Sequence, residues 1–227
     1  MGQPLPTKLY PLVKGTFTIT YIFLVTTGIV IFIEALRQGV GFISHVMNLE
    51  TAISVVAAYF YGLFMAEIEK SESLNQPIDW NKMIAYRYID WSITTPIMLL
   101  VLCLYLANNL KLSVKLGTYI IIVILNYIML SFGYMGEVGI TDRTTGVVGG
   151  FAAFGLMYFI IYTTFMKKYN FANFILFWFY AIVWSFYGIV YMLDNIYKIP
   201  ITNLLDLISK CFVGLGLWAY YTKILTV

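Results

Sequence analysis

Residues 201–225 read ITNLLDLISKCFVGLGLWAYYTKIL, which is long and apolar enough to cross a bilayer as one helix. Asp206 and Lys210 lie in its middle, and their spacing of four places the carboxylate and the amine on one helical face. A charged side chain near the bilayer centre costs about 2.5–3.5 kcal/mol on the mildest insertion scale, so it is usually functional and paired. Lysine also forms Schiff bases with carbonyl compounds. Lys210 is therefore either half of a structural ion pair or the attachment point of a carbonyl cofactor.

The composition is that of an integral membrane protein rather than a soluble domain. Of the 227 residues, 61% are hydrophobic and 11% are charged. Apolar stretches of about 20 residues recur at 12–35, 50–68, 83–107, 113–135, 144–166, 171–193 and 201–224. The expected fold is all-α, a bundle of seven transmembrane helices, with residues 1–227 as a single domain.

Several classes of site are not expected. Cys103 and Cys211 fall inside expected helices, so both are interpreted as small packing residues rather than a disulfide. His45 is expected in the first loop, as a surface residue. The basic residues form no stripe, so no nucleic-acid partner is expected, and neither a metal site nor enzymatic activity is predicted. The first apolar stretch is interpreted as a membrane helix rather than a signal peptide.

The third stretch carries a second set of intramembrane charges. Arg87, Asp90 and Thr94 are spaced three and four apart and so share a helical face. Together with Asp206 and Lys210, Arg87 and Asp90 indicate one buried network whose formal charges sum to zero, as burial requires. Pro96, later in the same helix, is expected to free the carbonyl four residues earlier for a water or a hydroxyl.

Other polar and aromatic residues have two interpretations each. Asn126 is placed to hydrogen-bond to a neighbouring helix, for example at Thr94 and Thr95, as structural glue or in function. The small residues of VVGGFAAFG (147–155) permit close approach of a neighbouring helix or of a flat ligand. An aromatic stripe in the sixth stretch usually faces lipid or core, but beside a cofactor lysine it is better interpreted as a stacking wall; it comprises Trp184, Tyr187 and Tyr191.

The first two stretches carry carboxylates only near their ends. Glu34 and Arg37 lie three apart at the end of the first, where the simplest interpretation is an interfacial ion pair. Glu67 and Glu69 end the second as solvated charges, and its apolar middle holds no carboxylate. A cation channel would need polar or acidic residues along such a helix, so this pattern counts against one.

Two motifs, RYIDWSITTP (87–96) and DLISK (206–210), resemble signatures of microbial (type 1) rhodopsins. The resemblance covers essentially the whole chain and extends to the proteorhodopsins and to the rhodopsins of giant viruses. It implies all-trans retinal as a protonated Schiff base on the helix-seven lysine. It also implies a lipid-embedded, multi-pass protein of a host or microbial plasma membrane, with the N-terminus outside and the C-terminus inside. Lys and Arg are divided equally between the two faces and do not decide orientation. A homo-oligomer is implied; the family forms both trimers and pentamers, and the analogy with the proteorhodopsins and the viral relatives favours the pentamer.

Carried over residue by residue, the resemblance assigns the central roles. Lys210 corresponds to the retinal attachment site, Asp90 to the primary counterion and proton acceptor, and Asp206 to the second counterion. Arg87 matches the arginine between the counterions and the extracellular exit. The remaining matches hold a counterion, line the retinal or affect its colour: Tyr61 beside the second counterion; Thr94 beside the acceptor; Trp91, Trp184, Tyr187 and Tyr191 in the aromatic cage; Thr95 and Asn126 as an interhelical pair; and Met98, Met129, Gly133 and Ser209.

Departures from the family pattern bear on the activity. Asp90, Thr94 and Val101 occupy the three positions that distinguish pump classes, and they disfavour chloride and sodium pumps; Asp206 disfavours an inward proton pump. Gly150 and Gly188 replace a tryptophan and a proline of the family. Val101 replaces the usual carboxylic acid donor and cannot donate a proton. The hypothesis is that Glu34, held by Arg37 and Trp218, takes over this role.

The expected function is a light-driven outward proton pump. The candidates for the release group are Glu69, Glu137 and Asp194. One alternative is a slow-cycling photosensor that signals to a transducer protein, which Val101 favours. The other is a light-gated ion channel, which the apolar middle of the second stretch disfavours.

Overall fold

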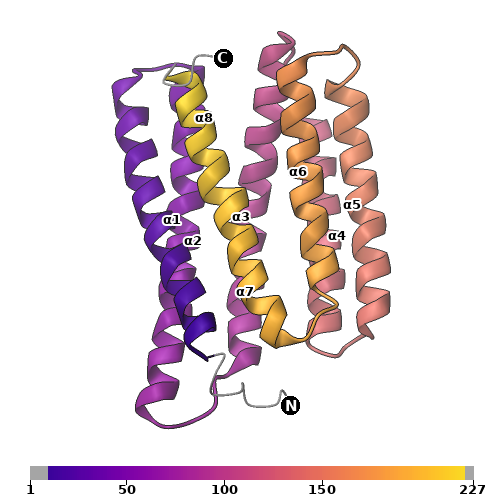
Figure 1. Cartoon of the computed structure of the whole chain (residues 1–227). Helices are drawn as coiled ribbons and strands as arrows, with labels where there is room; N and C mark the ends of the chain where they lie inside the picture. The colour runs from indigo at the N-terminus through magenta and orange to yellow at the C-terminus, as the bar shows by residue number, and fades with distance from the viewer. Residues whose placement is uncertain (1–9, 223–227) are drawn as a thin grey trace. The chain divides into compact units, whose positions relative to one another are not determined.

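Residues 10–222 are described by the computed structural model, and within them the chain forms helices and no strands. Seven helical segments are long and apolar enough to cross a membrane, as expected. Figure 1 shows them in chain order: α1 (Tyr10–Arg37), α2 (Phe42–Ser73), α3 (Trp80–Asn109), α4 (Leu116–Glu137), α5 (Arg143–Phe165), α6 (Phe171–Val190), and a last span made of α7 (Asn195–Asp206), the π-helical turn η1 (Leu207–Phe212) and α8 (Val213–Tyr221).

Helix boundaries differ from the expected ones at two places that matter for the site. The second helix begins at Phe42 rather than near residue 50, so His45 lies in α2 and not in a loop, although it is exposed as expected. This earlier start also places Glu50 two turns inside the helix. The last span begins at Asn195 instead of residue 201, and the expected residues 223 and 224 lie outside the described range.

Polar side chains and glycines end the helices. Asp142 caps α5 by accepting hydrogen bonds from the backbone nitrogen of Thr145 at 2.8 Å and from its hydroxyl at 2.6 Å. These bonds hold the pKa of Asp142 below its ordinary value. Gly39 and Gly139, in the connections after α1 and α4, adopt φ values of +66° and +78°, which favour glycine.

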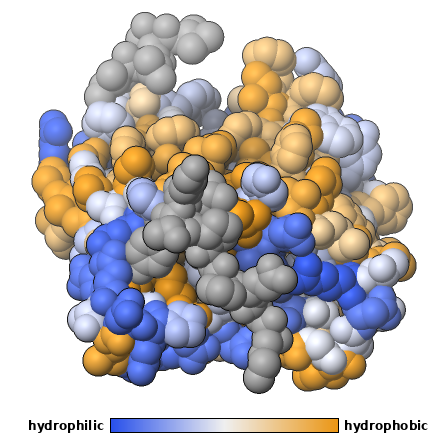
Figure 2. Space-filling model, turned by 60° about the horizontal axis from the view of Figure 1, so that its bottom comes forward, coloured by the Kyte–Doolittle hydropathy of each residue, from blue (hydrophilic) through white to orange (hydrophobic). Residues whose placement is uncertain are grey.

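The helices fall into two compact units, and each is described by itself. Unit 1 holds α1, α2, the part of α3 up to Asp90, and the last span from Leu193; unit 2 holds the chain from Trp91 to Met192. Exposed charges of unit 1 collect around the α2–α3 connection, at Glu69, Lys70, Glu72 and Asp79. Figure 2, which brings the lower end of Figure 1 forward, shows hydrophilic residues gathered there and hydrophobic ones along the sides. This distribution is typical of a membrane protein.

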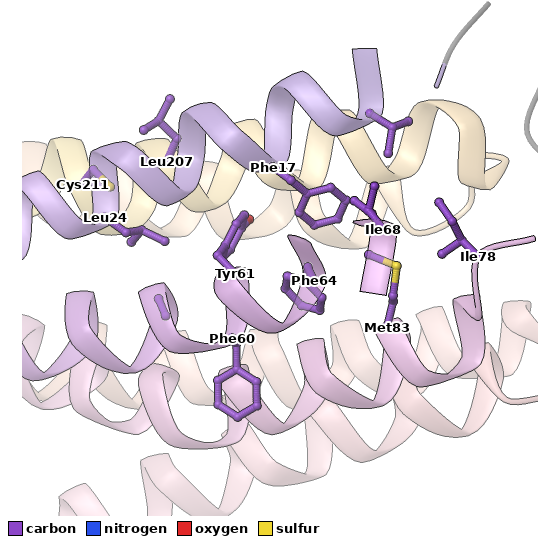
Figure 3. Packing of buried hydrophobic residues seen from close by; sticks show 12 residues of the cluster. Phe17, Leu24, Phe60, Tyr61, Phe64, Ile68, Ile78, Met83, Leu207 and Cys211 are labelled. Carbon is purple, nitrogen blue, oxygen red and sulfur yellow. The ribbon is translucent and has the colours of Figure 1, made fainter. Parts of the chain in front are cut away.

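The core of unit 1 is a column of apolar side chains between α1, α2 and the last span. Figure 3 shows Leu24, Leu207 and Cys211 at one end of this column and Ile78 and Met83 at the other, with the aromatic rings between them. Among these rings, Phe17 and Phe64 pack with centroids 5.2 Å apart. The aromatic section lies directly beside the charged residues described below.

In unit 2, small residues let α4 and α5 approach closely. A Cβ built on Gly149 would lie 2.5–2.7 Å from three ring atoms of Phe132, and one on Gly146 would lie 3.0 Å from the Phe132 carbonyl oxygen. The interpretation of VVGGFAAFG as a close-approach site for a neighbouring helix is therefore confirmed at Gly149. In contrast, a Cβ on Gly150 would meet only ordinary contacts, and one on Gly155 would meet open space.

Gly149→Ala is expected to destabilise the protein by about 1–3 kcal/mol, because the ring of Phe132 would have to move against its own backbone. The measurement is the half-life of the folded protein in detergent at raised temperature. Gly155→Ala, six residues later on the same helix, is the matched control and is expected to be neutral or slightly stabilising. Equal half-lives for the two variants would show that the glycine contact carries no packing energy.

Candidate functional site: a buried charge network around Lys210

Lys210 forms a buried ion pair with a carboxylate on another helix. Its Nζ donates a hydrogen bond to Asp90 Oδ2 at 2.6 Å, and the side chains are 2% and 0% exposed. Lys210 lies in η1, and Asp90 lies in the middle of α3. Two charges so far from water are tolerated only because they neutralise each other in good geometry. The sequence-based expectation of one network joining the third and seventh helices is confirmed.

Asp206 belongs to the same network through a different cation. Arg87 donates to Asp206 Oδ2 at 3.1 Å, and the Tyr61 hydroxyl donates to the same oxygen at 2.8 Å. The partnership of Tyr61 with the second counterion position is therefore present in the structure. Because Lys210 faces Asp90 while Arg87 faces Asp206, the four charges form two adjacent pairs with no net charge.

Asn203 is part of this network and was not anticipated. Its Oδ1 accepts from Arg87 at 2.7 Å and from Tyr61 at 3.2 Å, and its amide donates to the Thr16 hydroxyl at 3.0 Å. Asn203 lies one turn before Asp206 on α7. An amide three residues before an intramembrane aspartate was the available signal, because a polar side chain in such a span needs partners.

Arg87 is held on its other side by aromatic rings. Its guanidinium carbon lies 5.0 Å from the ring centroid of Phe64, 5.7 Å from that of Phe17 and 5.9 Å from that of Tyr61. Cation–π contacts of this kind stabilise a partly desolvated arginine. Arg87 is therefore held by polar partners and by aromatic rings at the same time.

Glu67 is not the solvated charge that the sequence indicated. It is 9% exposed, and its Oε2 accepts from Lys82 Nζ at 2.6 Å. The helix-end position of Glu67 was recognised, but Lys82 is fifteen residues away and only the packing of α2 against α3 brings them together.

The three release-group candidates differ in their surroundings. Glu69 and Asp194 are exposed. Glu137, in unit 2, lies 3.9 Å from Arg143 with its carboxylate largely buried. Burial with a cation nearby distinguishes Glu137 from the other two.

Unit 2 holds the residues that the family resemblance assigns to the retinal cage. Trp91 and Tyr187 make an edge-to-face contact with centroids 5.5 Å apart. The Tyr191 hydroxyl donates to the Gly133 carbonyl at 3.1 Å, and burial raises the pKa of Tyr191 to about 12, so it remains a donor at neutral pH. Thr94, Met98 and Trp184 are buried, while Met129 is half-buried. In unit 1, Ser209 is buried beside Lys210.

Two predictions about α3 and α4 are confirmed in unit 2. Asn126 donates to the Thr95 hydroxyl at 2.8 Å, which is the expected interhelical bond. Pro96 frees the carbonyl of Ser92, and the Tyr127 hydroxyl donates to that oxygen at 3.1 Å. The hydroxyl that was expected to replace the missing helical bond therefore comes from α4.

Two buried carboxylic acids lie beyond Lys210 on the side away from Asp206. Glu34, near the end of α1, is 6% exposed, with Arg37 at 3.6 Å and a short hydrogen bond from Gln38. Its proposed contact with Trp218 stays a prediction. Glu50 on α2 is 1% exposed and was missed, because the second helix was expected to begin at that residue.

Glu50 faces the last span one turn past Lys210. A Cβ built on Gly214 would lie 2.8 Å from Ile31 Cδ1 and 3.1 Å from Glu50 Oε2, so the Glu50 carboxyl lies directly against the backbone of the last span. Gly214 follows Lys210 by four residues, about 6 Å along a helix axis. Along the last span, Asp206 therefore lies one turn before Lys210, and Glu50 of α2 approaches one turn after it.

The residues around Lys210 fit a protonated imine. An aldehyde condenses with a lysine amine, and the resulting cation needs a nearby anion in a water-poor setting. Lys210 supplies a buried amine, and Asp90 supplies the anion at 2.6 Å. Lys210 would hold the chromophore covalently, and Asp90 would neutralise it.

The sequence and the fold match known proteins closely. A family model described as bacteriorhodopsin-like protein matches residues 12–224. The crystal structure of the viral rhodopsin OLPVRII is 41% identical, has a TM-score of 0.87, and the match covers 95% of this chain and 100% of that one. No curated protein sequence gives a significant match.

More distant structures share the fold. Exiguobacterium sibiricum rhodopsin is 20% identical with a TM-score of 0.79, and the match covers 96% of this chain and 98% of that one. The proton pumping rhodopsin AR2 of the marine alga Acetabularia acetabulum is 17% identical with a TM-score of 0.72, covering 99% of each chain. With the buried Lys210 in place, these matches show that the chain is a microbial (type 1) rhodopsin of the viral group, a family whose members bind retinal as a Schiff base on a lysine.

Proposed function

We propose that this rhodopsin is a light-driven outward proton pump and not an enzyme, with the N-terminus outside. The observation that carries the proposal is the placement of carboxylic acids on both sides of Lys210. Asp90 lies 2.6 Å from its amine, Asp206 is held by Arg87 one turn before it, and Glu50 reaches Gly214 one turn after it. A proton can therefore leave Lys210 on one side and be replaced from the other.

The first proton transfer follows from the ion pair. When bound, retinal supplies light absorption and an isomerisation that turns the N–H bond at Lys210 away from its counterion. Asp90 Oδ2 then accepts the proton of Lys210 Nζ, because the separated cation and carboxylate no longer stabilise each other's charged forms. Asp90 is thus the acceptor, and Arg87 responds to the change in its charge.

Arg87 links the acceptor to the exit side. With Asp90 neutral, the attraction that holds the guanidinium toward the counterions weakens, and the side chain moves along the rings of Phe17 and Phe64. This movement promotes proton release. Among the three release candidates, Glu137 is the one with a buried carboxylate beside a cation, Arg143 at 3.9 Å.

Reprotonation uses Glu50 as the inner donor and Glu34 as the group that refills it. Val101, in the usual donor position, is buried and has no ionisable group. Ile31 contacts the Gly214 position beside Glu50, and Glu34 follows it by three residues on α1. Glu34 lies three residues before the end of α1, whereas Glu50 lies eight residues inside α2, so Glu34 is the nearer of the two to the helix ends. The single donor expected at Glu34 is therefore replaced by two steps, in which Glu50 protonates Lys210 and Glu34 then reprotonates Glu50.

Light-induced pH change in an unbuffered suspension of retinal-supplied cells tests the pump. Acidification that a protonophore abolishes is the expected result. Alkalinisation, or no change in a coloured protein, would contradict outward pumping. A cycle lasting seconds rather than milliseconds, without acidification, would favour the sensory alternative, in which a transducer protein reads the slow state.

The donor relay is tested by two substitutions. Glu50→Gln is expected to slow the return of the proton to Lys210 by about 10²–10⁴-fold, the usual contribution of one positioned acid. Glu34→Gln is expected to slow the later refilling step and leave the first return step nearly unchanged. Time-resolved absorption after a flash measures both, with Glu72→Gln, at an exposed site that is given no role in the cycle, as the control. A wild-type return rate in Glu50→Gln would remove Glu50 from the pathway.

A light-gated cation channel is the second candidate, because α2 begins earlier than expected and so holds one buried carboxylic acid, Glu50, in addition to its apolar middle. Between Glu50 and Tyr61, however, α2 contributes Ala57 to an apolar cluster that also holds Leu24 and Cys211, all fully buried, and such a layer resists a continuous water path. Photocurrents that reverse sign with membrane potential would establish the channel; currents of one sign would support the pump.

A further inference from the structure

Three buried polar groups of unit 1 lack hydrogen-bond partners and lie in one neighbourhood. They are Thr27 on α1 and Glu50 and Ser54 on α2, each at most 1% exposed. Within the described residues, Ser54 Oγ and Glu50 Oε1 have no hydrogen-bond partner, and Thr27 Oγ1 has no oxygen or nitrogen partner, its hydroxyl facing only the weakly polar thiol of Cys211. Buried polar atoms in proteins are almost always hydrogen-bonded, to protein or to ordered water, so three orphans together require an explanation.

The contacts of two glycines place the three groups side by side. A Cβ on Gly28, next to Thr27 in the chain, would lie 3.3 Å from Ser54 Cβ. A Cβ on Gly214 would lie 3.1 Å from Glu50 Oε2 and 3.7 Å from Thr27 Cγ2. Glu50 and Ser54 are four residues apart on α2 and so share a face. The side chains that carry the carboxyl and the two hydroxyls therefore lie in one neighbourhood between α1, α2 and α8.

The hydroxyls of Thr27 and Ser54 differ from those of their neighbours. In helices, serine and threonine usually bond back to the carbonyl of the preceding turn. Thr26 does so to Ile22 at 2.8 Å, and Thr51 does so to Met47 at 2.8 Å. Thr27 and Ser54 make no such bond. The Ser54 hydroxyl therefore has no bond to give up, and the Thr27 hydroxyl has only the weak thiol contact, so both can serve a partner beside Glu50.

We propose that Thr27, Glu50 and Ser54 bind one internal water molecule that positions the Glu50 carboxyl for proton transfer. A buried water needs two to four polar partners, and these groups offer three. A carboxyl without a cation at this depth holds its proton, because an isolated buried charge is very costly. The water accepts from the Glu50 hydroxyl and donates to the two side-chain oxygens. Thr27 and Ser54 act as positioning residues; this role, though not the water itself, rests on the proposed pump.

The position of the water relative to Lys210 explains its use. Leu24, one turn before Thr27 on α1, and Cys211, next to Lys210, form the end of the apolar column in Figure 3. The water lies just beyond this end, on the side of Gly214. A proton from Glu50 therefore has a first acceptor close by before it crosses the apolar layer to Lys210.

Light-minus-dark infrared spectra of Thr27→Val and Ser54→Ala test the proposal. The Glu50 carbonyl band is identified by its loss in Glu50→Gln, and bound water by O–H bands that shift in water labelled with oxygen-18. Each variant is expected to move the carbonyl band to higher frequency, remove an isotope-sensitive water band, and slow proton return by about tenfold, the loss of one hydrogen bond. Thr26→Val and Thr51→Val, whose hydroxyls bond to backbone, are the matched controls and should leave all three signals unchanged.

The outcomes separate this site from the pump. Unchanged carbonyl and water bands in Thr27→Val and Ser54→Ala would overturn the water site. A shifted carbonyl band with no isotope-sensitive water band would also overturn it, because the hydroxyls would then bind Glu50 directly. If both bands respond but Glu50→Gln returns the proton at the wild-type rate, the water site stands and the donor role of Glu50 fails. An unchanged retinal absorption maximum shows that each variant is folded.

Discussion

Lys210→Ala protein incubated with all-trans retinal is expected to show no visible absorption band beyond that of free retinal. The amine of Lys210 is buried and lies 2.6 Å from Asp90 Oδ2. Without it, no imine can form at this site, and the Asp90 carboxylate loses its partner. Leaving one charge of a buried pair alone costs about 3–5 kcal/mol, so the variant should also unfold at a lower temperature.

Two controls make this result specific to Lys210. Lys70→Ala removes an exposed lysine and should leave the colour unchanged. Ser209→Ala alters the buried residue next to Lys210 and should keep the band while shifting its maximum. Absorption spectra and acid denaturation, which traps a covalent adduct, measure all three variants. A coloured Lys210→Ala protein would contradict the attachment site and with it the whole assignment of roles.

Asp90→Asn is expected to abolish light-driven acidification while leaving a coloured protein. An amide cannot accept the proton of Lys210, so the transfer should slow by at least about 100-fold, the lower limit for loss of one positioned base. Asp206 keeps its contacts to Arg87 and Tyr61, so one carboxylate remains near the cation and the chromophore can still be held. Flash-induced absorption changes and cell-suspension pH measure the transfer and the transport.

The matched control for this variant is Asp142→Asn, at an exposed N-cap of α5 where asparagine caps as well as aspartate. It should pump at the wild-type rate. Asp90→Glu, which restores a carboxylate on a longer side chain, should recover part of the transfer. Acidification by Asp90→Asn at the wild-type rate would exclude Asp90 as the acceptor.

Several features were predictable because they depend on local pattern. The spans follow from hydropathy, since an apolar stretch of this length must leave water. Asp90, Asp206 and Lys210 were recognisable because charges inside such spans are costly and need one another. The hydroxyl at the Ser92 carbonyl followed from Pro96, which removes one helical bond. In each case the sequence signal that supports the prediction lies within one helix.

The errors also have a common origin. Glu50 was missed because the start of the second helix was placed eight residues late, and a charged residue at a helix end is ordinarily solvated. Glu67 was interpreted as solvated because Lys82, its partner, is on another helix. Asn203 was overlooked because its importance comes from Arg87 and Tyr61, both distant in sequence.

The sequence by itself determined that this protein crosses the membrane seven times and carries one amine among intramembrane carboxylates. Only the tertiary structure decided which carboxylate meets that amine, that Arg87 and Tyr61 hold Asp206, and that Glu50 approaches Gly214 beyond Lys210. The physical reason is that hydropathy depends on consecutive residues, whereas charge pairing and hydrogen bonding join residues on helices that are distant in sequence. Spacing within a helix predicts a shared face, but the partner on that face comes from how the helices pack.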